Sequence, residues 1–441
     1  MLNPSKRPKI LNMPPREKKI FFSIYTLIFL LLQACVAGKH KKLDHFLEEK
    51  LSQAVFANQF TGFMVYDPVA ADTLYQYNSG KYFTPASNTK IFTLYAGLKL
   101  LPANIPSLKY LESNDTLYIQ GTGDPSLLHP YFQDSTALNF IKGYQKIALF
   151  SGNFNETHWG PGWAWEDYEG YYSPERTALP FSGNVVQIYK GDSLMVQPAY
   201  FRDSVSTIRY LFSRLRDANR FFYDPDSRDT VLIPFKTDTS LTRQLLEQAT
   251  GKRIFHAGKM PEGEIKTLYG QPTDSLYKRM MQESDNFLAE QLLLAASGIL
   301  SDTLNGHLAR NYVLEEFLED LPQPPVWVDG SGLSRYNLFS PEDMVYVLTD
   351  LYREIPEERL LGLFASGGIS GTIRDWYAGD EAPYVFAKTG TLANNHCLSG
   401  YLKTRSGRLL IFSFMHNHFR GSLTGIKQQM QGILEELRDT Y

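Results

Sequence analysis

The chain has 441 residues, of which 43% are hydrophobic and 14% aromatic, so it is long and apolar enough to bury a large core and to form more than one domain. Its formal net charge is −3, and without residues 1–34 it would hold 38 basic and 46 acidic residues, a net charge of about −8. This acidic balance argues against nucleic-acid binding, which requires concentrated Lys and Arg.

The first 34 residues have the pattern of a signal peptide. Six basic residues and a single acid precede the apolar stretch 20–32, which is too short to span a bilayer comfortably. Leu32-Gln-Ala-Cys35 then places a small residue before a cysteine, as in a bacterial lipobox, so we expect residues 1–34 to be removed and Cys35 to be lipidated. The alternatives are a secretory signal cut near Ala37-Gly38 and an uncleaved anchor. All three predict an extracytoplasmic protein, and the lipobox favours a periplasmic, membrane-anchored lipoprotein. After Cys35 only Cys397 remains, so no intrachain disulfide is expected.

The two ends of the chain together predict one antiparallel sheet with helices. Leucines at four-residue spacing predict an amphipathic helix over about 40–58, and a second such helix is predicted for the last residues, from Ile426 to Leu437. Alternating apolar runs bounded by turn residues predict five strands. These runs are 63–66, 74–77, 384–387, 396–403 and 408–414. We therefore expect a five-stranded antiparallel sheet with the terminal helices on one face.

The middle of the chain, residues 111–265, differs from both ends. Short strand-like runs broken by Gly, Pro and Asp occur at 117–120, 185–189, 194–197 and 230–233, and they predict an inserted β-rich domain. Residues 36–110 and 266–441 would then form one domain of the α/β class (α+β type). Leu-rich helical segments at 287–296 and 313–318 predict a helical subdomain within it.

Ser87-Asn-Thr-Lys90 is the first of three motifs that suit one chemistry. It precedes a helical apolar run, so Ser87 and Lys90, three residues apart, would lie on one face of a helix. A serine hydroxyl needs an adjacent base to become a nucleophile, and a partly desolvated lysine near other cations can be that base.

Two further motifs follow in order along the chain. Ser284-Asp-Asn286 lies between two helix-like runs, where a loop can direct a hydroxyl and an amide into one cleft. Lys388-Thr-Gly390 ends a predicted strand, where the lysine can reach a substrate carboxylate and Gly390 allows close approach. Each motif alone is compatible with chance, but their order and context together predict serine acyl transfer with a lysine base.

Other candidates are weaker. Ser275-Leu-Tyr-Lys278 repeats the first pattern, but it is better interpreted as a helix N-cap at Asp274 or Ser275. Gly121–Pro125 and Asp329–Leu333 are interpreted as turns, because neither has the ending of a phosphate loop. His416 and His418 lack further ligands, so no metal or cofactor is expected. An aromatic cluster is assigned to packing rather than to a sugar platform. Its members are Trp159, Trp163, Trp165, Tyr168, Tyr171 and Tyr172.

The three motifs resemble the signature of penicillin-binding proteins and class A β-lactamases. More narrowly, the chain resembles the D-alanyl-D-alanine carboxypeptidase/endopeptidase family of class C low-molecular-mass penicillin-binding proteins, peptidase family S13. The further matching segments are Asp115–Leu127, Pro161–Asp167, Asp329–Ser334 and Gly371-Thr372. The resemblance implies the penicillin-binding-protein fold with helices on both faces of the sheet. The insertion looks short for the two nested domains of that family.

The resemblance also implies roles for the site residues. Ser87 would attack the D-Ala-D-Ala carbonyl, Lys90 would take its proton, and Ser284 would relay a proton to the leaving amine. Asn286 would hold the substrate amide, and Lys388 and Thr389 would bind the terminal carboxylate. The oxyanion would lie between the backbone N–H groups of Ser87 and Thr391. The expected partners are peptidoglycan stem peptides and β-lactams, which would acylate Ser87.

Two other functions are compatible with the same motifs. β-Lactamases and some esterases use the same Ser–Lys pair, although the insertion and Lys388-Thr-Gly390 favour peptidoglycan. A lipid-anchored protein could also keep the fold as a cell-wall scaffold without catalysis. Carboxypeptidase and cross-link endopeptidase activities are both open, because each cleaves after a D-alanine.

Overall fold

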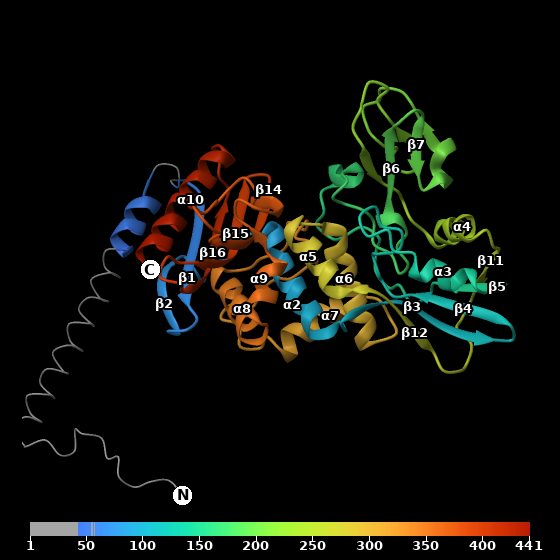
Figure 1. Cartoon of the computed structure of the whole chain (residues 1–441), viewed down its shortest axis with the longest axis horizontal. Coiled ribbons are helices and arrows are strands. Elements are labelled where there is room, and N and C mark those ends of the chain that lie inside the picture. The colour runs from blue at the N-terminus through green and yellow to red at the C-terminus, as the bar shows by residue number, and fades with distance from the viewer. Residues whose placement is uncertain (1–42, 54–55, 57) are drawn as a thin grey trace, which may run out of the picture.

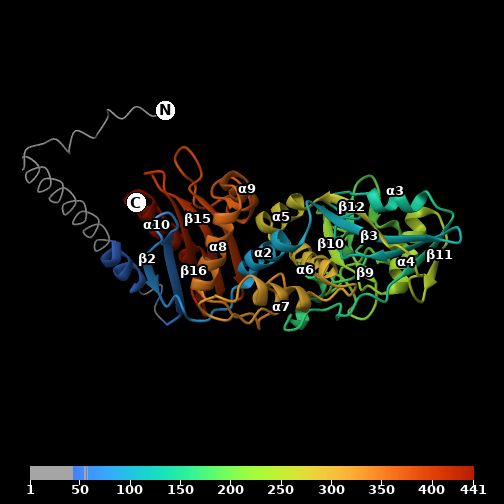
Figure 2. The same ribbon diagram turned by 90° about the horizontal axis from the view of Figure 1, so that it is seen from below.

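The computed structural model describes residues 43–53, 56 and 58–441. The expected signal peptide and Cys35 lie outside these residues. Within them, no helix is both long and apolar enough to cross a bilayer. The molecule is elongated, with a body built from both chain ends on one side and the middle segment on the other (Figure 1, Figure 2).

The body is organised around an antiparallel sheet of six strands. Their spatial order is β13-β14-β15-β16-β1-β2. The strands are β1 (Phe60–Asp67), β2 (Asp72–Tyr77), β13 (Ala365–Ser366), β14 (Val385–Leu392), β15 (Asn395–Lys403) and β16 (Leu409–Asn417). All five expected strands are present, and the two-residue strand β13 adds a sixth at the edge beside β14.

Side chains along the strands of the body alternate between the two faces of the sheet, and each face packs into a hydrophobic core of its own. Phe63 and Val65 point to a core shared with the terminal helices, whereas Met64 and Tyr66 point to the opposite face. The first face is covered by residues 43–51, which are helical, and by α10 (Leu423–Thr440). The expectation that both terminal helices share one face is therefore confirmed. The second face is covered by α2 (Lys90–Leu100) and α8 (Pro341–Glu354), which continues into α9 (Glu357–Leu363).

A helical subdomain extends the second core away from the sheet. It consists of α5 (Thr273–Gln282), α6 (Asn286–Leu300) and α7 (Gly306–Glu316), which pack around α2. Helix α6 is buried on nearly all sides, so its sequence is apolar almost throughout. This position at the centre of the molecule lets its N-terminal Asn286 reach Lys90 on α2, while Gln291 binds Thr177 of the middle segment (Figure 1).

The middle segment contains a five-stranded sheet and a three-stranded sheet. The larger has the order β11-β5-β4-β3-β12 and the smaller β10-β6-β7. The strands are β3 (Asn104–Ser113), β4 (Thr116–Gly121), β5 (Lys146–Phe150), β6 (Val185–Lys190), β7 (Leu194–Gln197), β10 (Val231–Pro234), β11 (Ile254–Ala257) and β12 (Lys266–Pro272). The four strands expected here are all present. A two-stranded pair, β8 (Val205–Ser206) and β9 (Phe221–Phe222), joins the lobe that carries β6 and β7 (Figure 1).

The strand pairing shows how the proposed limits of the insertion relate to the sheet. Strand β3 begins at Asn104 and β12 ends at Pro272, and these two strands pair with each other inside the larger sheet. The division expected at 110/111 thus falls inside β3, and the one expected at 265/266 falls directly before β12. The segment also contains α3 (Thr136–Lys142) and α4 (Thr239–Thr250), so it is mixed rather than purely β-rich. The smaller sheet lies in a lobe that projects from the larger one (Figure 1), and the two sheets share one hydrophobic core.

Candidate active site

The first motif forms a tight turn that leads into α2. A 3-10 turn, η2 (Ala86–Thr89), holds Ser87, and Lys90 is the first residue of the helix. Ala86 has a φ of +48°, a left-handed conformation that is strained for a residue with a side chain and turns the chain just before the serine. Lys90 Nζ lies 2.9 Å from Ser87 Oγ. The contact expected from the three-residue spacing is therefore present.

Lys90 is completely buried and has two further hydrogen-bond acceptors. Its Nζ donates to Asn286 Oδ1 at 2.6 Å and to the backbone carbonyl of Ser331 at 2.5 Å. Burial lowers the pKa of Lys90 from its usual value to about 7, although the negative charges of Asp329, Glu290 and Asp285 oppose the shift. A large fraction of the lysine is thus uncharged at neutral pH.

Ser284 lies in the connection between α5 and α6, as expected. Its φ of +59° turns the chain sharply between the two helices. The next residue, Asp285, caps α6 by accepting a hydrogen bond from the backbone N–H of Leu288 at 3.1 Å, and it also binds Arg279. Asn286 follows as the first helical residue, and its Nδ2 donates to the carbonyl of Tyr172 at 2.8 Å. The amide therefore bridges the middle segment and Lys90.

The third motif lies on β14, and its lysine reaches the second serine. Lys388 Nζ donates to Ser284 Oγ at 2.9 Å and to the carbonyl of Thr389 at 2.8 Å. Its side chain is fully buried, and burial together with the charge of Lys90 places the pKa of Lys388 well below its usual value. Each lysine is thus hydrogen-bonded to a serine of a different motif.

Gly390 lets β14 approach the nucleophile turn. A Cβ at this position would lie 2.3 Å from the carbonyl oxygen of Pro85 and 3.1 Å from the backbone nitrogen of Ser87, so only glycine fits. The neighbouring threonines are held by side-chain contacts: Thr389 Oγ1 lies 2.7 Å from Thr372 Oγ1, and Thr391 Oγ1 lies 2.9 Å from His396 Nδ1.

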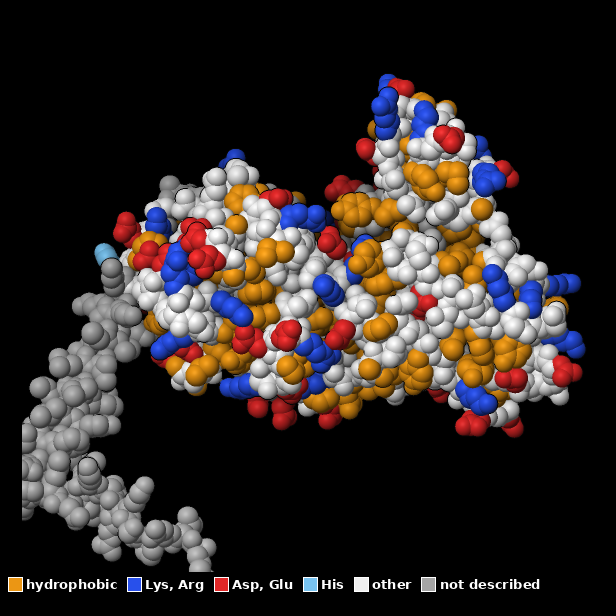
Figure 3. Space-filling model, viewed as in Figure 1, with side chains coloured by type: hydrophobic (Ala, Val, Ile, Leu, Met, Phe, Trp, Pro, Cys, Tyr) orange, Lys and Arg blue, Asp and Glu red, His pale blue; other side chains and the backbone are white. Residues whose placement is uncertain are grey.

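A cleft of about 850 Å³ opens in front of these residues. The body contributes Ser87, Ser284, Asn286, Thr372 and Thr391 to its lining, and the middle segment contributes aromatic and acidic side chains. The latter include Glu166, Asp167, Tyr171 and Tyr172. Figure 3 shows the surface hollowed between the body and the lobe that carries β6 and β7. Lys90 and Lys388 have no exposed surface and lie behind the cleft wall, whereas Thr389 is 7% exposed and contacts Thr372, which lines the cleft.

The segment Asp329–Leu333 was interpreted as a turn, and it is one, but it also belongs to the site. Asp329 is buried and its carboxylate accepts hydrogen bonds from the backbone N–H groups of Gly332 and Ser334 and from the indole of Trp163. The loop so formed presents the Ser331 carbonyl to Lys90. No sequence pattern reports a contact made through a backbone carbonyl, so the interpretation as a simple turn missed it.

Other weak candidates are separated from this chemistry. Ser275 is exposed within α5, which begins at Thr273 with Pro272 at its N-cap, so the N-cap expected at Asp274 or Ser275 is wrong. His416 is buried against Thr61 and His418 is exposed. Among the residues described, no three His, Cys, Asp or Glu side chains gather as a metal site would require. Of the aromatic cluster, Trp163 is buried, whereas Trp165 and Tyr171 are largely exposed.

The fold and the three facing motifs define a serine enzyme of the penicillin-binding-protein class. The chain belongs to the D-Ala-D-Ala carboxypeptidase 3 (S13) family, whose model matches residues 43–199 and 239–437. It is therefore an enzyme of the D-Ala-D-Ala carboxypeptidase type.

The chain is similar to curated relatives over most of its length, and solved structures share its fold. The chain is 24% identical to the D-alanyl-D-alanine carboxypeptidase DacB of Haemophilus influenzae, over 89% of this chain and 92% of the relative. It is 23% identical to penicillin-sensitive carboxypeptidase A of Dictyostelium discoideum, over 75% and 76% of the two chains. The crystal structure of penicillin-binding protein 4 from H. influenzae superposes with a TM-score of 0.69 at 21% identity, covering 89% of this chain and 99% of that one. A predatory endopeptidase of Bdellovibrio bacteriovorus gives a TM-score of 0.50 at 18% identity, over 86% and 94%.

Proposed function

We propose that the protein cleaves the D-Ala-D-Ala bond, or the D-alanine cross-link, of peptidoglycan stem peptides through an acyl-enzyme on Ser87. The observation that carries this proposal is the hydrogen bond between Ser87 and a buried lysine whose pKa is lowered to about 7. A hydroxyl becomes a nucleophile when such a base takes its proton as the new bond forms.

The contacts of Lys90 suit a base. A neutral amine has two N–H bonds and one lone pair. The acceptors Asn286 Oδ1 and the Ser331 carbonyl, at 2.6 and 2.5 Å, occupy the two N–H bonds, so the lone pair is left for the Ser87 hydroxyl at 2.9 Å. Lys90 takes the proton of Ser87 Oγ while that oxygen attacks the D-alanine carbonyl.

The backbone supplies the stabilisation of the oxyanion. The N–H groups of Ser87 and Thr391 would receive the negative oxygen, and the contact of Gly390 with the nucleophile turn brings β14 close enough for both to act. In related chemistry each such donor contributes roughly 3 kcal/mol to the stability of the transition state.

Ser284 and Lys388 form a path for the proton that the leaving amine needs. The proton that Lys90 takes from Ser87 has to reach the leaving amine as the peptide C–N bond breaks, and the Ser284 hydroxyl, which lines the cleft, would relay it while the hydrogen bond from Lys388 holds that hydroxyl in place. Because Lys388 lies behind Ser284, we propose that it acts on the terminal carboxylate mainly through its field. The hydroxyls of Thr389 and Thr391 would then bind the carboxylate directly.

Water completes the reaction by hydrolysing the ester on Ser87, which releases a peptide ending in D-alanine and restores the hydroxyl. β-Lactams would acylate the same serine. Three of the acids lining the cleft have partners: Asp167 receives a hydrogen bond from Tyr172, Asp285 is paired with Arg279, and Glu283 lies 3.4 Å from Arg374. The fourth, Glu166, has an exposed side chain. No carboxylate motif beside Ser87 suits activation of a hydrolytic water, which favours a long-lived penicillin adduct over rapid lactam turnover.

Assays on defined muropeptides test this function. We expect release of D-alanine from a pentapeptide monomer, cleavage of a cross-linked dimer, or both, with loss of activity after treatment with benzylpenicillin. Fast turnover of a chromogenic cephalosporin without action on muropeptides would instead identify a β-lactamase. A folded protein inactive on all of these substrates would favour the scaffold alternative.

We also propose that the enzyme is a periplasmic lipoprotein anchored through Cys35. The support is the basic, apolar and Cys-terminated order of residues 6–35. Labelling of the expressed full chain with a radioactive fatty acid, compared with a Cys35→Ala variant, tests the anchor. Label that persists in the variant, or is absent from the parent, would contradict it.

A further inference from the structure

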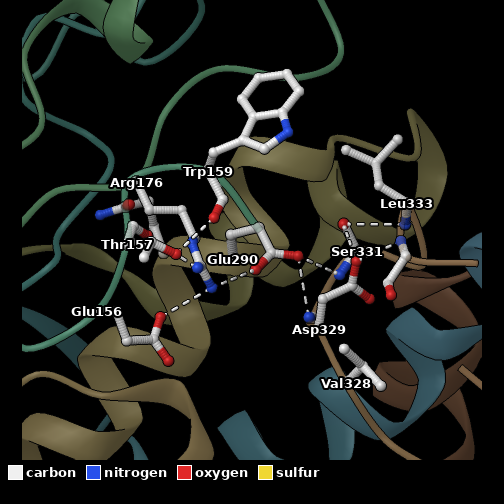
Figure 4. Close-up of polar contacts among 12 residues, drawn as sticks. Glu156, Thr157, Trp159, Arg176, Glu290, Val328, Asp329, Ser331 and Leu333 are labelled. Carbon is white, nitrogen blue, oxygen red and sulfur yellow. Dashed lines mark hydrogen bonds and ion pairs between the residues drawn. The ribbon is translucent and has the colours of Figure 1, made fainter. Parts of the chain in front are cut away.

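The position of the catalytic lysine depends on a peptide group outside the three motifs. The Ser331 carbonyl accepts one of the hydrogen bonds of Lys90, at 2.5 Å. The same loop is held from behind by Glu290, whose Oε1 accepts hydrogen bonds from the backbone N–H groups of Gly330 at 3.0 Å and Ser331 at 2.8 Å (Figure 4). The backbone of Ser331 therefore connects the Glu290 carboxylate with the base, Lys90.

Helix α6 thus contacts Lys90 along two routes. Asn286 and Glu290 are four residues apart and lie on one face of the helix. Asn286 accepts directly from Lys90, whereas Glu290 acts on Lys90 through the Ser331 peptide. Glu290 is only 2% exposed and does not line the cleft, so it does not touch the substrate.

The other oxygen of Glu290 connects this arrangement to the middle segment. Glu290 Oε2 lies 3.4 Å from Arg176 Nη1, which also pairs with Glu156 at 2.8 Å (Figure 4). Arg176 Nη2 donates to the carbonyl of Thr157 at 2.9 Å. The next residue on α6, Gln291, accepts from the backbone N–H of Thr177 and donates to its carbonyl. The segment around Arg176 is therefore fastened to α6 directly behind the catalytic lysine.

We propose that Glu290 is a positioning residue, which fixes the Ser331 carbonyl and raises the proton affinity of Lys90, and that Arg176 holds Glu290 in place from the middle segment. The inference rests on the proposed function. It assigns to the inserted segment a role in setting the catalytic base, in addition to forming one wall of the cleft.

A purely structural role would not require a charge at this position. An ionised carboxylate buried without water is costly, and a neutral amide could accept the same two N–H groups. The charge matters because it faces a lysine that must change its protonation state. Burial raises the pKa of Glu290 to about 7, so the carboxylate is ionised in the range above that pH, where Lys90 becomes neutral. A negative group nearby stabilises the protonated form and so moves the pKa of Lys90 up, against the effect of burial.

The other charged groups near the two residues are few. Asp285 and Asp329 act on Lys90 in the same direction as Glu290, and Lys388 lies close enough for the charge of Lys90 to lower its pKa. Around Glu290, burial and Asp329 raise the pKa of the carboxyl while Arg176 lowers it, and Arg310 on α7 faces the same carboxylate. Among these charged groups, in the part of the chain that the structure describes, Glu290 is the one that accepts hydrogen bonds from the backbone N–H groups of Gly330 and Ser331.

The test is the pH dependence of acylation by benzylpenicillin, measured as the second-order rate constant for wild type and Glu290→Gln. The amide keeps the acceptor oxygen and removes the charge. We expect the acid limb of the profile to move to lower pH, by about half a unit or more, because Lys90 loses a charge that favours protonation. Glu290→Asp keeps the charge but is too short to reach both N–H groups, so it should leave the limb near the wild-type pH and lower the plateau rate.

Glu156→Gln is the matched control, since it removes the other carboxylate on Arg176 without contacting the loop. Its profile should keep the wild-type limb. Thermal unfolding of every variant shows whether it is folded. A folded Glu290→Gln protein with the wild-type limb and rate, or an equal shift in Glu156→Gln, would overturn the inference. If wild type itself does not react with penicillin, the proposed function fails. NMR titration of the Lys90 side chain in wild type and Glu290→Gln then measures the pKa of Lys90 directly and decides the inference separately.

Discussion

Lys388 donates a hydrogen bond to Ser284 across 2.9 Å, the same distance that separates Lys90 from Ser87. Both lysines are completely buried, and the charge of Lys90 lowers the pKa of Lys388. Two buried ammonium groups in one site repel each other, so the site favours states in which at least one lysine is neutral. Acylation then requires that Lys90 be the neutral lysine, because it has to accept the proton of Ser87.

Ser87→Ala should abolish the covalent adduct with benzylpenicillin, because the nucleophilic oxygen is removed while the fold around it remains. Intact-mass spectrometry of the purified protein measures the adduct directly. We expect one equivalent in wild type and none in the variant. Ser275→Ala is the control, since Ser275 shares the Ser-x-x-Lys pattern but is exposed on α5 and should not affect the adduct. An adduct that survives Ser87→Ala would assign the nucleophile to another residue.

Acylation should depend on pH with an acid limb near pH 7. Burial lowers the pKa of Lys90 to about 7, so the lysine is protonated and inactive as a base below that pH and becomes neutral above it. The rate constant should rise roughly tenfold per pH unit below the pKa and level off above it. Stopped-flow measurement with a chromogenic β-lactam from pH 5 to 9 gives the profile. A limb near pH 10 would mean that Lys90 is not desolvated in solution.

The sequence predicts the local elements that hold the three motifs, because each motif is bound to a regular pattern. The apolar run after Lys90 is helical, and alternation along 384–403 marks two strands of the sheet, so both are recognisable without a structure. The meeting of Ser87 with Lys90 follows from helical geometry alone. The meeting of Lys388 with Ser284 is a long-range contact that no local pattern encodes: the order of the motifs predicted one active site, but not this contact.

The sequence does not reveal the residues that support the base from behind. Glu290 lies within a Leu-rich helix, where one acidic residue looks like a solvated position, yet it is buried. The Ser331 carbonyl has no side-chain signal at all. The pairing of β3 with β12, which joins residues far apart in the chain, has no local signal either. Such contacts are set by tertiary packing rather than by local propensity.

Thr389→Val should weaken recognition of the substrate's terminal carboxylate. The hydroxyl of Thr389 is held by Thr372 at 2.7 Å and would be one of the groups that bind that carboxylate. Loss of one hydrogen bond to a charged group costs about 1.5 to 3 kcal/mol, so kcat/KM for a free pentapeptide should fall by roughly 10-fold or more. The same peptide with an amidated C-terminus is the control and should be affected much less. An equal loss on both peptides would show that Thr389 acts on the fold and not on the carboxylate.

Gly332→Ala should both destabilise the protein and slow acylation, because Gly332 has a φ of +84° and a Cβ there would lie 1.9 Å from the carbonyl oxygen of Ala86. The strained backbone and the contact with the nucleophile turn together should lower the free energy of unfolding by about 2 kcal/mol or more. Urea unfolding followed by circular dichroism measures this change. Gly425→Ala is the matched control: it lies in α10 with no atom within 4 Å of the added Cβ, so it should keep or slightly raise stability. Wild-type stability and acylation in Gly332→Ala would mean that the loop 329–334 can move away from Ser87, and that its carbonyl does not fix the catalytic lysine.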